Sequence, residues 1–219
     1  NGKDDTLGIG DWTTVEIDGV DYQVRILGFN HDELVDKTIY GGTNTYGGIS
    51  FEFAECIGRD WMNSTNTNVG GWGACELRGT LNSTIYDSLE NKAYIKKVNK
   101  DYIEVRNDPE SVTSSQDKIW LLSYSEVWNK GRNGQPYGWA VAKEGEQYKY
   151  YEDMDLDVDV ADARLIKLVL GSNGNNMNGS WWLRSPHYAN NVGWGCVASS
   201  GACASEVYNS QHLAPGFAI

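Results

Sequence analysis

The sequence predicts a single α+β domain over residues 1–219, with short, twisted antiparallel strands, two or three helices and long loops. Signals for strands and helices are interspersed along the chain, and no repeating strand–helix–strand unit is present. Gly accounts for 25 residues and Pro for only 4, a composition that favours many turns. A chain of 219 residues is also long enough to bury a sizeable core.

The first expected element is a hairpin near the N-terminus. Residues 15–17 and 20–26 alternate apolar and polar side chains, as half-buried strands do. Asp18 and Gly19 between them are a strong signal for a two-residue turn. Residues 1–11 precede the hairpin and are a candidate linker.

Loops and two helices are expected next. Residues 41–48 and 62–73 are rich in Gly and Asn and predict loops. Residues 72–81 favour a short helix. Residues 87–98 open with Asp-Ser-Leu-Glu, the spacing of a capping box, in which two side chains satisfy the first free N–H groups of a helix.

A second capping box lies at Ser123 and Glu126. The flanking Leu122 and Val127 occupy the two positions of a hydrophobic staple, which fixes the entry into a helix. The preceding residues 118–122 form a short apolar run, and this run predicts a buried strand.

Residues 152–162 alternate strictly between acidic and apolar side chains. On an extended strand the four aspartates would share one face, so they are candidates for a calcium site, which needs converging oxygen ligands. An EF-hand is excluded because its turn glycine is missing. The alternative is a solvated strand edge whose charges discourage further pairing. The aspartates are Asp153, Asp155, Asp157 and Asp159, of which the first three are the calcium candidates.

Charge and motif content narrow the function classes. With 18 Lys and Arg against 30 Asp and Glu, the formal net charge is −12, which argues against nucleic acid as a partner. No apolar run is long enough for membrane insertion. The sequence contains no H-E-x-x-H, G-x-S-x-G or Walker motif. We therefore expect no enzymatic activity, no cofactor and no metal beyond the calcium candidates.

The cysteines leave two alternatives open. Cys196 and Cys203 flank a segment that favours a hairpin centred on residues 199–200. They would face each other across two strands, which fits either a cross-strand disulfide or two free, half-buried thiols. The disulfide state of Cys56 and Cys75 is equally open. No two cysteines have the spacing of a zinc site.

The C-terminal region carries the most specific motif. Trp181-Trp-Leu-Arg-Ser-Pro186 is followed by Val197-x-x-x-Gly201 and then by Ala214-Pro-Gly-Phe-Ala-Ile219. This pattern resembles the ending of a C-type-lectin-like domain family that is abundant in gut bacteria and their phages. The resemblance implies a C-type-lectin-like fold over about residues 12–219. Three upstream segments fit the family as well, namely residues 25–31, 62–72 and 121–127.

The same ending occurs in the variable proteins of diversity-generating retroelements, where reverse transcription rewrites adenine-templated codons. The resemblance implies a diversified ligand-binding region at residues 187–212, displayed on a virion such as a phage tail or on a cell surface, and assembly into a homo-oligomer. Tyr and Trp in this region suit rigid anchors, and Ser and Asn suit adaptable hydrogen bonding. The candidate ligand-binding residues are His187, Tyr188, Asn190, Asn191, Trp194, Ser199, Ser200, Ser205, Glu206, Tyr208, Asn209, Ser210 and His212.

Some residues in this region are expected to be structural, and others are expected not to vary. The apolar residues at 181–183 are expected in the core, and Arg184 is expected to be a structural hydrogen-bonding residue. Trp194, Glu206 and Gln211 cannot arise from an AAC or AAT codon mutated only at its adenines. They are therefore expected to be constant or to come from other codons.

The leading hypothesis is a non-catalytic domain that recognises a protein or glycan on a target cell surface. One alternative is an enzyme, because formylglycine-generating oxidases share the lectin-like architecture and bind copper through a C-terminal cysteine pair, comparable with Cys196 and Cys203. The other alternative is a structural surface domain without diversification.

Overall fold

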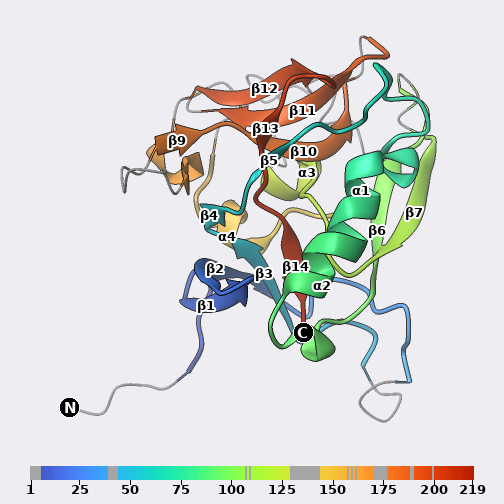
Figure 1. The fold of residues 1–219 in the computed structure, drawn as a ribbon. Helices are drawn as coiled ribbons and strands as arrows, with labels where there is room; N and C mark the ends of the chain where they lie inside the picture. The colour runs from blue at the N-terminus through green and yellow to red at the C-terminus, as the bar shows by residue number, and fades with distance from the viewer. Residues whose placement is uncertain are drawn as a thin grey trace.

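β-Strands dominate the fold (Figure 1). The structure is a computed structural model and describes residues 6–38, 44–106, 108, 110–128, 144–156, 158, 160, 162–169, 177–187, 190–198 and 200–219. Within these residues strands account for 40% and helices for 17%, and the strands form four separate sheets. The expected α+β, C-type-lectin-like fold is therefore wrong, and the chain has a β-rich fold with little helix.

The first sheet has the strand order β1-β2-β3-β14 and lies in the lower part of Figure 1. Its β1–β2 hairpin confirms the predicted turn, because Asp18 and Gly19 have φ values of 48° and 81°, the left-handed backbone that such a turn requires. Gly10 and Asp11 also pair with Ile26, so part of the candidate linker belongs to this sheet. The strands are β1 (Trp12–Ile17), β2 (Val20–Phe29), β3 (Ile49–Phe53) and β14 (Gly216–Ala218).

The second large sheet has the order β12-β11-β10-β13-β5 and lies at the upper end of Figure 1. Its central strand β10 pairs antiparallel with β11 and parallel with β13. The predicted hairpin is confirmed, since Cys196 on β11 lies opposite Cys203 on β12. The strands are β5 (Arg59–Asp60), β10 (Trp181–Pro186), β11 (Gly193–Ala198), β12 (Gly201–Glu206) and β13 (Gln211–His212).

Two smaller sheets, β4-β8-β9 and β6-β7, complete the strand content of the described residues. After β7, residues 119–122 are fully buried as predicted. They do not form the predicted strand, because only Trp120 makes a bridge, to Gly216. The strands are β4 (Glu55–Cys56), β6 (Val98–Ile103), β7 (Val112–Asp117), β8 (Lys167–Val169) and β9 (Met177–Gly179).

The longest helical stretch lies close to the predicted short helix and continues beyond it. The capping-box prediction at residues 87–98 is wrong, because this stretch ends at Ser88, Leu89 is extended and Asn91 has a φ of 59°. The stretch consists of α1 (Glu76–Thr80), a π-helical turn (Leu81–Ile85) and α2 (Tyr86–Ser88). Single 3-10 turns occur at Trp72–Ala74, Lys92–Tyr94 and Ala163–Leu165.

The second capping box is confirmed at the start of α3 (Tyr124–Val127). Ser123 Oγ accepts a hydrogen bond from the Glu126 N–H, and Glu126 Oε2 accepts one from the Ser123 N–H at 2.9 Å. The helix is a single turn, because Trp128 returns to extended backbone. Within the described residues, no helix combines the length and apolar character needed to cross a membrane.

The acidic alternation at residues 152–162 does not form a strand where the structure describes it. It follows α4 (Lys149–Glu152), and the chain then turns, with Asp155 at a φ of 48°. Leu156 and Val158 are nevertheless 5% and 1% exposed. Val160, the next apolar residue of the alternation, is 55% exposed, so the alternation predicted only part of the inward-facing set and not the path of the backbone.

Candidate functional site

The strand β10 provides a buried base for the candidate site. All six of its residues are buried, which confirms the predicted core position of the apolar motif residues. Trp181 Nε1 donates to the Leu165 carbonyl at 3.1 Å, and Trp182 Nε1 donates to the Asp60 carbonyl at 2.9 Å. Both indoles therefore combine burial with a satisfied N–H group.

Arg184 on this strand is a structural hydrogen-bonding residue, as predicted. Its guanidinium forms a two-pronged ion pair with the buried Glu126 carboxylate. It also donates to the backbone carbonyls of Asp101, Leu121 and Glu144. A guanidinium has five donors in a fixed plane, so these contacts tie β10 to three other segments.

A second cation strengthens this buried network. Lys100 Nζ contacts Glu126 Oε1 at 2.5 Å and Asp32 Oδ1 at 2.7 Å. Burial opposes ionisation of Glu126, but Arg184 and Lys100 outweigh it and lower its pKa to about 2. Burial likewise opposes the charge on Arg184, whereas Glu126 raises its pKa. Both partners therefore stay charged at neutral pH.

A disulfide joins β11 and β12, the two strands that follow β10 in the order of this sheet. Cys196 and Cys203 are bonded to each other, so in this state neither sulfur is the free thiolate that the copper-enzyme alternative requires. Cys56 and Cys75 are free and buried. Burial raises the pKa of these thiols to about 11 and about 12, which makes them unreactive near neutral pH.

The predicted ligand-binding residues differ in exposure. The exposed members are Asn191, Ser200, Glu206, Tyr208 and Asn209. The half-buried members are His187, Asn190, Ser205, Ser210 and His212. Tyr188 and Ser199 lie outside the described residues.

Four of the exposed residues come together at one end of the β11–β12 hairpin. The Val207 N–H donates to the Val192 carbonyl at 2.7 Å, which places the adjoining Asn191 and Tyr208 in neighbouring backbone segments. Ser200 lies at the other end of the hairpin, before β12 begins. We call Asn191, Glu206, Tyr208 and Asn209 the β12 edge patch; Tyr208 is its most prominent apolar surface, at 56% exposure.

Other predicted residues take supporting positions. Trp194 is fully buried and packs in the same core cluster as Trp182, so its predicted place on the contact surface is wrong. His212 lies within the sheet, with its ring Nδ1 3.1 Å from the Ser180 carbonyl oxygen. Burial lowers the pKa of both His187 and His212, which favours neutral imidazoles.

Asn68 is a supporting residue that the sequence reasoning missed. Its Nδ2 donates to the carbonyls of Asn190 at 3.0 Å and Gly193 at 2.7 Å, and its backbone N–H donates to the Asn191 carbonyl at 2.8 Å. Asn68 thus holds the segment that carries Asn191. The sequence predicts residues 62–73 only as a loop rich in Gly and Asn, and this pattern does not single out Asn68.

The calcium candidates do not form a site in the described residues. Asp153 Oδ1 forms an exposed ion pair with Lys149 at 2.7 Å, and Asp157 lies outside the described residues. Across the described ranges, no three His, Cys, Asp or Glu side chains converge as metal ligands.

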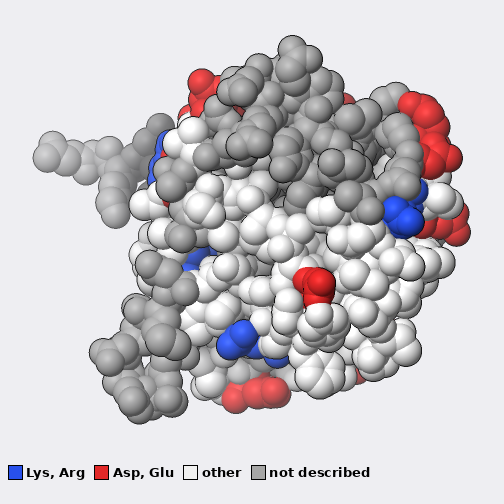
Figure 2. Space-filling model, turned by 90° about the horizontal axis from the view of Figure 1, so that it is seen from above, with Lys and Arg blue, Asp and Glu red and all other residues white. Residues whose placement is uncertain are grey.

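The β12 edge patch contains one charged residue, Glu206, beside the uncharged Asn191, Tyr208 and Asn209. Figure 2 looks down on the end of the molecule that carries β11 and β12, and uncharged side chains predominate among the described residues on this face. Cavities of about 290, 380 and 200 Å³ are lined by other residues. An open, polar patch with a single carboxylate, Glu206, is better suited to a macromolecular surface than to a small enclosed ligand.

The fold and this patch define a β-rich domain with a buried central strand and an exposed edge at β12. The chain belongs to the DUF6273 family, described as a domain of unknown function, whose match covers residues 41–219. No curated protein and no solved structure matches the chain. The family match contains β10, Arg184 with its partner Glu126, and the β12 edge patch, whereas the β1–β2 hairpin and Asp32, the second partner of Lys100, precede it.

Proposed function

We propose that this chain is a non-catalytic binding domain that recognises a protein or glycan on a target cell surface through the β12 edge patch. One observation carries the proposal: the side chains proposed to contact a ligand are exposed, whereas the strands that hold them in place are buried. Tyr208 and Glu206 are exposed, whereas β10 and β11 beneath them are buried except for the half-buried Ala198. The disulfide, Asn68 and Arg184 hold this support, so side chains of the patch can change without disturbing the core.

The proposal extends to diversification and location. Tyr and Asn are residue types of adaptable binding surfaces, and the patch presents Tyr208, Asn191 and Asn209. We propose that the positions around the patch are diversified by a retroelement and displayed by a homo-oligomer on a phage tail or a cell surface. A neighbouring reverse transcriptase gene with a template repeat differing only at adenines supports this, and its absence from the genome contradicts it.

Binding is tested with a variant that removes the patch. Asn191→Ala, Glu206→Ala, Tyr208→Ala and Asn209→Ala are combined, and the matched control combines Asp36→Ala with Lys37→Ala on another exposed segment. Wild type and both variants are applied to glycan arrays and to a panel of fixed bacterial cells. We expect the patch variant to lose every surface that wild type binds and the control to keep them. Equal binding by the patch variant, or no binding by wild type, overturns the proposal.

The copper-enzyme alternative is tested by counting thiols. The denatured, unreduced protein should take up two alkyl groups, at Cys56 and Cys75, and four after reduction. Four labels before reduction, together with tight copper(I) binding by the native protein, would instead favour the enzyme.

A further inference from the structure

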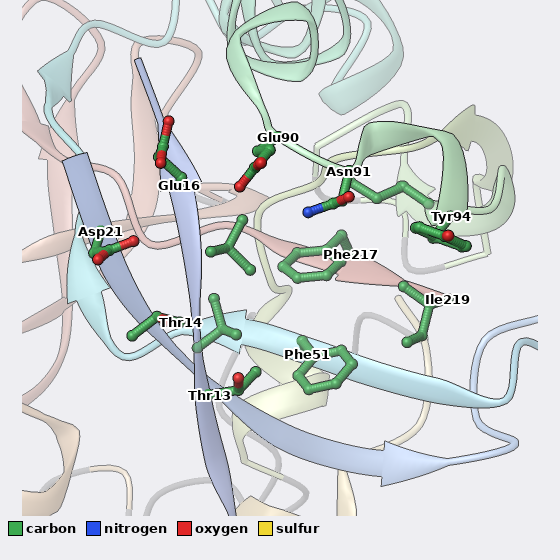
Figure 3. A pocket seen from close by; sticks show the side chains of 13 residues that line it. Thr13, Thr14, Glu16, Asp21, Phe51, Glu90, Asn91, Tyr94, Phe217 and Ile219 are labelled. Atoms are coloured by element: carbon green, nitrogen blue, oxygen red, sulfur yellow. The ribbon is translucent and has the colours of Figure 1, made fainter. Parts of the chain in front are cut away.

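A cavity lies at the opposite end of the molecule from the β12 edge patch. It has a volume of about 290 Å³ and opens between β1 and the 3-10 turn at Lys92–Tyr94 (Figure 3). The rings of Phe51 and Phe217 stack in its wall, with centroids 5.3 Å apart. The other apolar residues of the wall are Val15, Val24, Ile95 and Ile219. This size lies at the small end for ligand pockets and suits an inserted apolar side chain.

The cavity also opens onto the backbone edge of β1. Four consecutive residues, Thr13–Glu16, line it. Because successive side chains of a strand point to opposite faces, contact with all four requires the edge of the strand. β1 is the outer strand of its sheet, so this edge is not covered by another strand of the sheet.

Thr14 carries the free hydrogen-bonding groups of this edge. The Glu16 carbonyl accepts from the Glu90 N–H at 3.0 Å, on the side of β1 away from β2. Alternate residues of an antiparallel strand direct their backbone groups to the same side, so the Thr14 N–H and C=O also point outward. Neither group has a partner among the described residues, and Thr14 is exposed. Glu90 therefore covers the edge at Glu16 and leaves it open at Thr14.

The charge around the cavity favours a basic partner. Glu16, Asp21 and Glu90 are among its described lining residues, and no Lys or Arg is. Glu16 and Asp21 are directly opposite each other in the hairpin, where two like charges destabilise the pair. A Lys or Arg brought to this edge would reduce that repulsion.

We propose that the open edge of β1 binds an extended peptide segment of a partner protein by strand addition. The peptide pairs with the Thr14 N–H and C=O, inserts one apolar side chain into the cavity, and carries Lys or Arg near Glu16 and Glu90. Backbone pairing supplies affinity in this mode of recognition and the side-chain cavity supplies selectivity. This site is independent of the β12 edge patch.

The test uses random decapeptides displayed on yeast and selected on the wild-type protein. Thr14→Pro removes the outward N–H but leaves the hairpin intact, because an edge strand tolerates proline at such a position. Thr14→Val is the matched control, since it changes the side chain and keeps both backbone groups. We expect enriched peptides with an apolar residue flanked by basic ones. Their affinity should fall about tenfold in Thr14→Pro, the scale of one hydrogen bond, and stay unchanged in Thr14→Val.

A second measurement uses the wild-type protein and needs no Thr14→Pro variant. The best peptide is N-methylated at each backbone nitrogen in turn, and amide NMR shifts of the wild-type protein follow its binding. One methylation should abolish binding, and the Thr14 amide should shift with the unmodified peptide. The proposal is overturned if no peptide is enriched, if Thr14→Pro and all methylated peptides bind normally, or if the shifts map to the β12 edge patch. Self-association through Thr14 without peptide binding would also overturn it, because the occupant would then be a second copy.

Discussion

Arg184 ties the central strand β10 to three other segments, and its ion pair with Glu126 is fully buried. Replacing it with Met leaves the Glu126 carboxylate buried without its principal partner. We expect Arg184→Met to lower the free energy of unfolding by about 3–5 kcal/mol, the usual cost of breaking a buried pair. Urea unfolding measures this change.

The matched control is Arg164→Met, which removes an exposed ion pair with Asp162. Because solvent screens that pair, its unfolding midpoint should stay at the wild-type value. Equal midpoints for the two variants would show that the Arg184 network contributes no more than a surface pair.

The pKa of Glu126 predicts how the stability of the fold depends on pH. Its pKa in the folded chain is about 2, below its ordinary value of 4.5. Its contribution to stability is therefore complete above pH 4.5 and is lost as the pH falls through about 2. We expect Glu126→Gln to be less stable at neutral pH and to lose less additional stability in acid, as measured by urea midpoints across this range.

Glu144 provides a control, because its pKa is shifted in the opposite direction from that of Glu126. Burial raises the pKa of this carboxyl, so its contribution is present below its ordinary pKa and is lost as the pH rises. Glu144→Gln should therefore lose more stability in acid than wild type does. Parallel acid profiles for the two variants would contradict both assignments.

At the scale of an element, the β1–β2 turn isolates a pure backbone effect. Gly19 has a φ of 81°, and a Cβ atom added there would meet no other atom within 4 Å. Gly19→Ala should therefore cost about 1 kcal/mol through the left-handed backbone alone. Gly58 has equally open surroundings without a left-handed φ, so Gly58→Ala should unfold at the wild-type temperature or slightly above it. Equal thermal midpoints for the two variants would contradict this reading of the turn.

Local signals predicted some elements well, because their physical cause lies within a few residues. Asp18 and Gly19 formed the expected turn, and Ser123 with Glu126 formed the expected capping box. The similar pattern at Asp87 failed because a helix already ends there and Asn91 adopts left-handed backbone. A capping pattern indicates that a helix can begin at a residue. It does not show whether the conformation of the neighbouring chain allows the helix to form.

The acidic alternation failed for a reason that no local pattern contains. Tyr151, just before it, is buried, and its hydroxyl donates to Glu52 at 2.8 Å across 99 positions of sequence. This contact helps place α4 and the turn that follows, so the aspartates do not continue as a strand in the described residues. Contacts this distant also determine the β-rich fold class, since strands as short as β5 and β13 exist only through their pairing with each other and with β10.

For the whole molecule, the two proposed contact regions lie at opposite ends of Figure 1, the β12 edge patch at the top and the open edge of β1 at the bottom. The first region is proposed from the residue types in the sequence. The sequence could not separate the exposed Tyr208 from the buried Trp194, because burial depends on how the sheet packs. The second region was not predicted, since its cavity combines β1 with Phe51 and Phe217 from distant strands.

If the β12 edge patch binds and the core only supports it, the two should respond differently to mutation. Because the β12 edge patch is exposed, the combined variant at Asn191, Glu206, Tyr208 and Asn209 should unfold at the wild-type urea concentration while losing binding. Trp182→Ala is the contrasting variant, since that side chain is fully buried in the core, and its loss should cost about 3–5 kcal/mol. If the patch variant were destabilised as strongly as Trp182→Ala, the patch would be part of the folding core. It could then not vary freely, and the proposal of a diversified binding surface would fail with it.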